Sequence, residues 1–261
     1  MVNSNPLDYL PLWALIGLIA AGILLFIELG FRYGKHRCKV SEPESTASLG
    51  TIIGSILGLL AFMLAFTFGL AASRFEMRRQ MVVKEANAIG TTFLRAGFLP
   101  ELESRHVRSL LKEYVASRLE VARTGGVESA LHRADELHLA LWKDAEVVGL
   151  RQAESETVSL FIEALNETID VHTERVLVGL RSRLPFALWL ALFLLTALSM
   201  VGVGYHESLA KSKRSPATFL LLLGFLTVLT LIVDLDRPME GFLSVSQESM
   251  VSAQKMMDSF P

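Results

Sequence analysis

Four long blocks of apolar residues constrain this chain more than any other feature of its sequence. The blocks run over residues 10–27, 49–72, 186–205 and 217–233, and none of them contains a charged side chain. A hydrocarbon core about 30 Å thick is crossed by about 20 residues of helix. Because lipid cannot hydrogen-bond the backbone, such segments cross it as helices. The sequence therefore predicts an all-α membrane protein.

The block boundaries give the expected domain organisation. We expect transmembrane helices over residues 10–31, 49–72, 186–205 and 216–233, followed by a C-terminal tail over 234–261. The first block follows no positively charged segment and ends in no small-residue cleavage site, so it is expected as a retained helix rather than as a signal peptide.

A charged segment separates the second and third spans. Residues 73–185 hold 33 of the 52 charged side chains, and their Lys/Arg and Asp/Glu counts of 16 and 17 nearly cancel. Apolar residues recur there at helical spacing, with breaks at Leu99-Pro100 and at Gly125-Gly126. We expect a helical extramembrane domain over 73–185, in which span two continues as helix to Phe98 and a third helix leads directly into span three.

Composition excludes several classes of function. A net charge of −2 lacks the basic surface that nucleic acid requires. Cys38 is the single cysteine, which excludes an intrachain disulfide or a zinc site with several thiolates. The sequence has no glycine-rich phosphate loop, nucleophile elbow or metalloprotease helix. We therefore expect no enzyme, no cofactor and no metal, and a lipid bilayer as the first partner.

Small residues line span two at intervals of four. They form two adjacent rows, which are Gly50, Gly54 and Gly58, and then Ala61, Ala65 and Gly69. Small residues at this spacing let helix backbones approach closely in lipid. The rows predict helix packing, either within one chain or between the subunits of a homo-oligomer.

Aromatic and basic residues follow on the same helix. Phe62, Phe66 and Leu70 continue the spacing of four, and Arg74, Arg78 and Arg79 stand just beyond the apolar block. The apolar side chains could face lipid or the protein core, and a basic flank commonly anchors a span at the interface. Repeated by symmetry, however, the first set would form a hydrophobic constriction, and the arginines would form an electrostatic collar that concentrates anions.

A polar string ends span four. Asp234, Asp236 and Arg237 precede Pro238 and Gly241, and carboxylates at a membrane edge are costly unless they are paired or solvated. The string is either a structural salt-bridge cluster or a cation-binding clasp. We expect it to form a membrane-edge polar cluster with two residues of the extension of span two, Glu85 and Asn87.

Two of these strings resemble a known family. Residues 66–79, continued by 85–89 and 94–100, together with 234–238 and Gly241, resemble the bestrophin-like family of four-span membrane proteins. That family is distantly similar to bestrophins, which are pentameric anion channels with cytosolic helices between spans two and three. The resemblance implies a pore neck at Phe62 and Phe66 and places the helical domain and both termini in the cytoplasm. The short acidic string departs from the calcium-binding cluster of bestrophins.

The leading hypothesis from the sequence is a homo-oligomeric ion channel in the cell membrane that passes inorganic anions, with span two lining the pore. The resemblance implies a pentamer. The rival hypothesis is a membrane-anchored interaction or sensor protein whose helical domain recruits a partner and which has no pore. An even number of spans puts both termini and the helical domain on one side, but the basic flanks nearly balance and do not choose that side.

Overall fold

The computed structural model describes residues 10–40, 46–209, 216–237 and 241–260, so Pro238 of the polar string lies outside the described residues. In these ranges the chain forms helices and no strand, and four of the helices are long and apolar enough to cross a membrane. The elements are α1 (Leu12–Val40), α2 (Thr46–Arg95), η2 (Ala96–Phe98), α3 (Glu101–Thr124), α4 (Val127–Arg151), α5 (Glu156–Val176), η3 (Leu177–Arg181), α6 (Phe186–Leu209), α7 (Pro216–Asp236) and α8 (Glu248–Asp258).

The chain divides into two compact units. The spanning unit comprises residues 1–74 and 183–243, and the helical-bundle unit comprises residues 75–182 and 244–261. The long helix α2 contributes its apolar half to the first unit and its polar half to the second. The segment expected as a tail thus contributes a helix, α8, to the helical-bundle unit.

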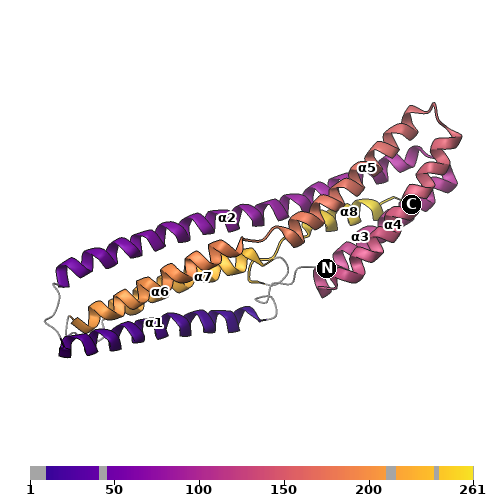
Figure 1. The fold of residues 1–261 in the computed structure, drawn as a ribbon. Helices are drawn as coiled ribbons and strands as arrows, with labels where there is room; N and C mark the ends of the chain where they lie inside the picture. Colours follow the sequence, from indigo (N-terminus) through magenta and orange to yellow (C-terminus); the bar gives the residue numbers. More distant parts are fainter. Residues whose placement is uncertain (1–9, 41–45, 210–215, 238–240, 261) are drawn as a thin grey trace. The chain divides into compact units, whose positions relative to one another are not determined.

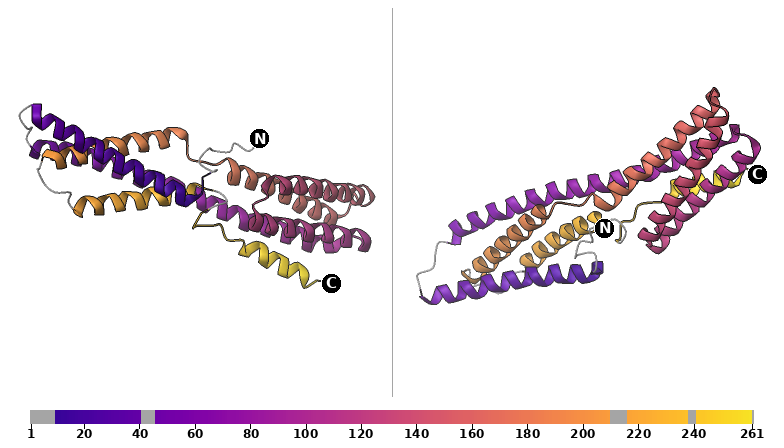
Figure 2. Two further views of the ribbon diagram at one scale, coloured as in Figure 1. Left: turned by 90° about the horizontal axis from the view of Figure 1, so that it is seen from below. Right: turned by 45° about the vertical axis from the view of Figure 1, so that its right-hand side comes forward.

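Glycines bring two helices of the spanning unit together. α1 packs along α6 and touches α7 more lightly, as Figures 1 and 2 show. A Cβ at Gly30 would overlap the carbonyl oxygen of Val201, and one at Gly204 would overlap that of Ile27. The two backbones therefore touch directly, which is how small residues pack helices where lipid supplies no hydrophobic drive.

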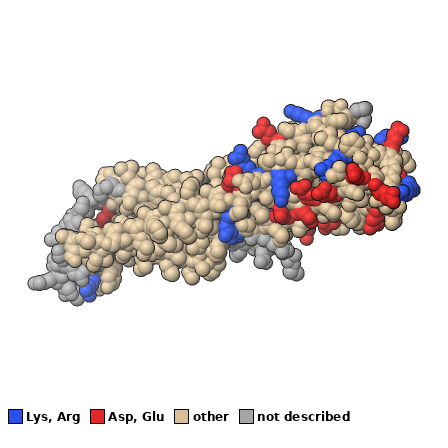
Figure 3. Space-filling view, turned by 90° about the horizontal axis from the view of Figure 1, so that it is seen from above, with Lys and Arg blue, Asp and Glu red and all other residues tan. Residues whose placement is uncertain are grey.

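The helical-bundle unit has an apolar core of its own. Its fully buried large side chains include Phe93 of α2, Leu111 and Tyr114 of α3, Leu141 of α4 and Phe161 of α5. α8 adds further buried methionines to this core. The helices are amphipathic, and Figure 3 shows charged side chains gathered over the outer surface of this unit. Burial of the apolar stripes against one another stabilises the bundle.

The breaks between the bundle helices follow from local chemistry. Gly125 ends α3 in the left-handed conformation, with φ 75°, and its N–H donates to the Val121 carbonyl. Ser155 caps α5 by accepting a hydrogen bond from the Val158 N–H. The expectation that the third helix leads directly into span three is wrong. α5 ends at Val176, the π-helical turn η3 follows, and residues 182–185 are not helical.

Candidate functional site

The spanning half of α2 exposes aromatic side chains. Phe62 is 67% exposed and Phe66 is 51% exposed, while Leu70 is half-buried. Their spacing of four residues puts the three on one slowly drifting row of the helix. Large apolar groups that remain exposed in one chain need lipid or another subunit to cover them.

The small residues of α2 make few contacts inside the described chain. A Cβ added at Gly54, Gly58 or Gly69 would meet nothing within 4 Å, and one at Gly50 would lie 3.4 Å from His206 Nε2. The close intramolecular packing of the spanning unit is found between α1 and α6 instead. The glycine row of α2 therefore remains available to a further helix.

Ala61 and Ala65 line an apolar groove. The groove has a volume of about 660 Å³ and lies between α2 and α7, within the spanning unit. Leu64 and Phe68 contribute from α2, and Gly224 with its neighbours contributes from α7. The second small-residue row thus faces a space that an apolar group could fill.

The three arginines expected as a collar have different surroundings. The Arg74 guanidinium donates to the carbonyl oxygen of Arg183, so it ties α2 to the segment before α6. Arg78 is buried, with 5% of its surface exposed. The side chain of Arg79 is 61% exposed and lies 3.4 Å from a carboxylate oxygen of Glu76. Arg79 is therefore the member of this set that faces solvent most fully.

Asp234 closes the turn after α7. Its Oδ1 accepts a hydrogen bond from the Phe242 N–H at 2.8 Å, and its Oδ2 accepts one from the Leu243 N–H at 3.0 Å. A Cβ at Gly241 would overlap Oδ1, so a side chain there would displace the carboxylate. Both carboxylate oxygens of this buried residue accept backbone hydrogen bonds, which is the arrangement of a structural cap.

Asp236 and Arg237 fasten other segments of the spanning unit. Asp236 Oδ1 accepts from the Leu184 N–H at 2.9 Å, and its Oδ2 lies 3.7 Å from Arg183 Nη1. Arg237 Nη2 donates to the Leu10 carbonyl at 2.7 Å. The polar string therefore joins the end of α7 to residues that precede α6 and α1.

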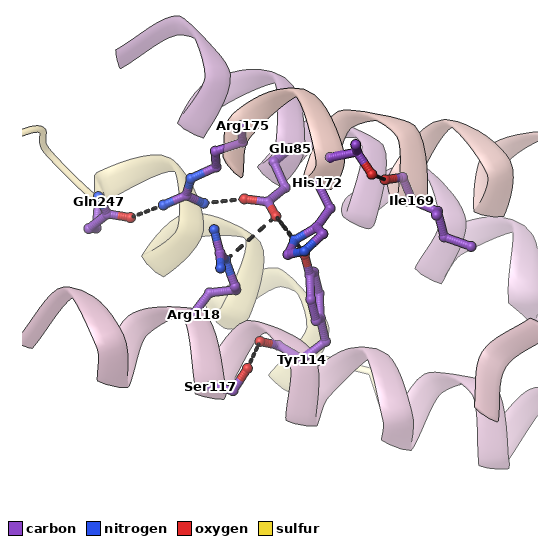
Figure 4. A network of polar contacts seen from close by, with 9 residues as sticks. Glu85, Tyr114, Ser117, Arg118, Ile169, His172, Arg175 and Gln247 are labelled. Atoms are coloured by element: carbon purple, nitrogen blue, oxygen red, sulfur yellow. Dashed lines mark hydrogen bonds and ion pairs between the residues drawn. The ribbon is translucent and has the colours of Figure 1, made fainter. Parts of the chain in front are cut away.

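Glu85 is the centre of a separate polar cluster inside the helical bundle, drawn in Figure 4. We call it the polar hub, and its members are Glu85 of α2, Tyr114 and Arg118 of α3, His138 of α4, and His172 and Arg175 of α5. Glu85 is fully buried. It accepts a hydrogen bond from the Tyr114 hydroxyl at 2.6 Å and another from Arg175, and its Oε1 lies 3.6 Å from Arg118 Nε.

Two histidines extend the polar hub. His172 Nδ1 lies 2.8 Å from the Tyr114 hydroxyl and 3.5 Å from Glu85 Oε1. The His138 ring packs edge-on against the His172 ring, with centroids 4.8 Å apart, and lies 4.9 Å from the Tyr114 ring. Arg175 also donates to Gln247, which precedes α8, so the hub reaches the C-terminal segment of the same unit.

Burial and charge in the polar hub shift its titration. Burial opposes ionisation of Glu85, but its hydrogen bond with His172 and the charges of Arg118 and Arg175 prevail and hold its pKa below the ordinary value. Burial, reinforced by the charge of Glu85, raises the pKa of Tyr114 well above 10. Burial lowers the pKa of His138 to about 4. These directions keep Glu85 charged and Tyr114 and His138 neutral at neutral pH.

The membrane-edge cluster expected from sequence falls into two sets of contacts. Glu85 belongs to the polar hub, and Asn87, two residues further along α2, is exposed on another face of the helix. Asp234, Asp236 and Arg237 make their contacts within the spanning unit. A clasp that joins the two sets stays a prediction.

Sequence reasoning missed most of the polar hub. Tyr114, Arg118, His138 and His172 all stand at positions of apolar helical stripes, where a polar residue signals a buried partner. That signal was present in the sequence, but it does not say which stripes meet. Among the described residues no group of three His, Cys, Asp or Glu side chains is arranged to hold a metal ion.

Comparison with solved structures agrees with this architecture. A bacterial bestrophin homolog from Klebsiella pneumoniae with a single substitution is 16% identical, with a TM-score of 0.68 over 92% of this chain and 98% of that chain. Another structure of the Klebsiella pneumoniae homolog is 17% identical, with a TM-score of 0.64 over 94% of this chain and 97% of that chain. At such identities the likeness shows the fold alone.

Comparison with sequences identifies the family. No curated protein matches the chain significantly. A family model described as the Bestrophin-like domain matches residues 17–250, which is most of the chain and includes both strings singled out in the sequence. The protein is therefore a member of the bestrophin-like family of membrane proteins.

Proposed function

We propose that the protein is a homo-oligomeric ion channel that passes anions, with α2 lining the pore. The observation that carries the proposal is the face of α2 that exposes Phe62 and Phe66 beside glycines whose Cβ positions are open. A helix with these two features can pack closely against its own copies and still present aromatic side chains to a common axis.

The proposed constriction is formed by Phe62, Phe66 and Leu70. Rings of such apolar side chains oppose the entry of water and so gate ions by dewetting. The arginines that follow on α2 set the sign of the field at the pore mouth, and Arg79 is the one with an exposed side chain. Its neighbour Glu76 reduces that field, so we expect a modest preference for anions rather than strict selection.

Conductance in planar bilayers tests the constriction. The purified chain should conduct, and the double variant Phe62→Ala, Phe66→Ala should conduct several-fold more because the narrow apolar rings are removed. Phe219→Ala is the matched control, since Phe219 is an aromatic residue of α7 that is 64% exposed. Absence of conductance in every variant, or equal changes in the double variant and the control, would refute a pore along α2.

Selectivity and assembly need separate measurements. Arg79→Gln should move the reversal potential in a chloride gradient toward that of a less anion-selective pore, whereas Lys143→Gln, a change in α4, should leave it in place. The mass of the detergent-solubilised protein should correspond to several chains. A strict monomer would overturn the pore, because one copy of α2 cannot enclose an axis.

We further propose that the helical-bundle unit lies in the cytoplasm. If α1 and α2 both cross the membrane and α2 continues into that unit, the segment between α1 and α2 would lie on the opposite side, and so would exposed Cys38 near the end of α1. As the single cysteine it provides a direct probe. A membrane-impermeant maleimide added to intact cells should label Cys38, and Cys38→Ser should abolish labelling. Labelling that requires cell lysis would reverse the orientation.

A further inference from the structure

Arg118 is a buried cation with little to balance its charge. Its side chain is 9% exposed and its Nε has no contact with solvent. Among the residues that the structure describes, its guanidinium makes no hydrogen bond and one ion pair, with Nε at 3.6 Å from Glu85 Oε1. Because Nε is buried, water cannot satisfy its N–H group, and a charged donor left without a hydrogen bond is costly.

The Glu85 carboxylate is already engaged by other groups. The Tyr114 hydroxyl donates to its Oε1 at 2.6 Å, and Arg175 donates to its Oε2. The polar hub thus sets one carboxylate against two guanidinium groups. The repulsion is felt inside the hub, because the Arg118 charge is one of the causes, after burial, that lower the pKa of Arg175.

A second nitrogen in the hub lacks a partner. His138 is 7% exposed, and its buried Nε2 makes no hydrogen bond to any described residue. Arg118 also acts on this imidazole, since its charge contributes to the lowered pKa of His138 after burial and His172. The hub therefore holds two buried nitrogens that can donate a hydrogen bond and have no acceptor among the described residues, Arg118 Nε of α3 and His138 Nε2 of α4, beside the excess of positive charge.

We propose that Arg118, together with Arg175, binds a small inorganic anion of chloride size inside the helical bundle. Figure 4 shows the two arginines on one side of Glu85, with Tyr114 and His172 on the other. An anion there balances the charge of the second guanidinium and accepts the hydrogen bond of Arg118 Nε–H that Glu85 does not accept. Guanidinium groups are suited to this task because they are weakly hydrated and always charged. The site is separate from the pore along α2 and does not depend on conduction.

Anion binding to the folded chain alone stabilises it by mass action, which provides the assay. The full-length protein in neutral detergent is unfolded by heat at pH 8 while chloride replaces gluconate at constant ionic strength. The unfolding midpoint of the wild type should rise by several degrees and saturate, and nitrate should act similarly. Arg118→Gln should lose most of this rise. Arg133→Gln should keep it, because Arg133 is an exposed residue of α4 that pairs with Glu113 and Glu136.

A variant that fails to fold leaves the proposal testable. Arg118→Lys keeps the charge but loses the planar donor set, so its half-saturating chloride concentration should rise about tenfold, the size of effect expected when a well-placed charged hydrogen bond is lost. The wild-type protein should broaden the chloride-35 NMR line, and added nitrate should reduce this broadening by displacing bound chloride. The pore is separated from the site by the double variant Phe62→Ala, Phe66→Ala, which should retain the chloride effect.

Three results would overturn the proposal. The first is a wild-type midpoint that does not change with chloride at fixed ionic strength. The second is an equal chloride response in the wild type, Arg118→Gln and Arg118→Lys. The third is a response that disappears in the pore double variant, which would place the bound anion in the pore. Absence of conductance would contradict the proposed channel and leave this site unaffected.

Discussion

The stability of the helical bundle should fall in mild acid because of one histidine. His138 lies on α4 with 7% of its surface exposed, and its ring contacts those of His172 and Tyr114. Burial, with the neighbouring His172 and Arg118 acting in the same direction, lowers the pKa of His138 from 6.5 to about 4. The folded protein therefore holds this imidazole neutral at pH values where the unfolded chain is protonated.

The sign and size of the effect follow from proton linkage. Since the folded pKa lies below the unfolded pKa, the unfolded state binds the proton first as pH falls. The stabilisation is complete above about pH 6.5 and is lost between there and pH 4. For a single site with these two pKa values, the loss between pH 7 and pH 5 is about 2 kcal/mol. In a chain of this length it lowers the unfolding midpoint by roughly 4–8 °C.

Thermal unfolding of the full chain in detergent at pH 7 and pH 5 measures this effect. His138→Gln removes the titrating group, so the variant should lose about 2 kcal/mol less than the wild type between the two pH values. His132→Gln is the matched control, because the His132 side chain on the same helix is 78% exposed. Glu85 does not interfere, since its lowered pKa confines its contribution to pH below about 4.5. An unchanged pH dependence in His138→Gln would refute the assignment.

Three further substitutions test the packing and the caps through unfolding midpoints in detergent. Gly30→Ala should destabilise the spanning unit by about 1–3 kcal/mol because the added Cβ would overlap a carbonyl oxygen of α6. Gly17→Ala should be neutral because there is open space around Gly17. Equal effects of the two substitutions would contradict the close contact between α1 and α6. Tyr114→Phe should lower the free energy of unfolding by about 2 kcal/mol because it removes a hydrogen bond to a buried carboxylate. Tyr33→Phe, at an exposed ring, should leave it unchanged. A neutral Tyr114→Phe would contradict that hydrogen bond. Asp234→Asn should lower the free energy of unfolding by about 2 kcal/mol, because the amide nitrogen cannot accept one of the two backbone hydrogen bonds that the carboxylate accepts. An unchanged free energy would show that the turn does not depend on the charge.

The spans could be predicted from sequence because the bilayer simplifies the problem. A charge-free block such as 49–72 has no alternative in lipid to a helix that satisfies its own backbone. The breaks in the bundle were equally local, since Gly125 ends α3 by adopting a conformation that other residues avoid. The ending of α5 before α6 was not anticipated. There the apolar spacing continues through residues 176–180 while the backbone changes to a π-helical turn.

Contacts between distant segments were beyond the reach of the sequence. Gly30 and Gly34 of α1 pack against α6, yet Gly34 lies past the apolar block. The glycines of α2 have the more regular spacing, so the sequence pattern predicted close packing on α2 and not on α1. The polar hub joins side chains 29 to 90 positions apart in the chain. A polar residue in an apolar stripe indicates that a partner exists, but its identity depends on how the helices turn toward one another.

The two halves of α2 are held in different ways, and this bears on how the helix works. In the helical-bundle unit Ile89 and Phe93 are fully buried in the core, and Glu85 is fastened from α3 and α5. In the spanning unit the same helix leaves a long face of small and aromatic residues exposed. One end of α2 is therefore fixed by an apolar core and a buried charge network. The other end has an exposed face that lipid or further copies of α2 would cover. Because α2 is a single continuous helix, the buried charge of Glu85 and the proposed constriction at Phe62 and Phe66 lie on the same element, one in each unit.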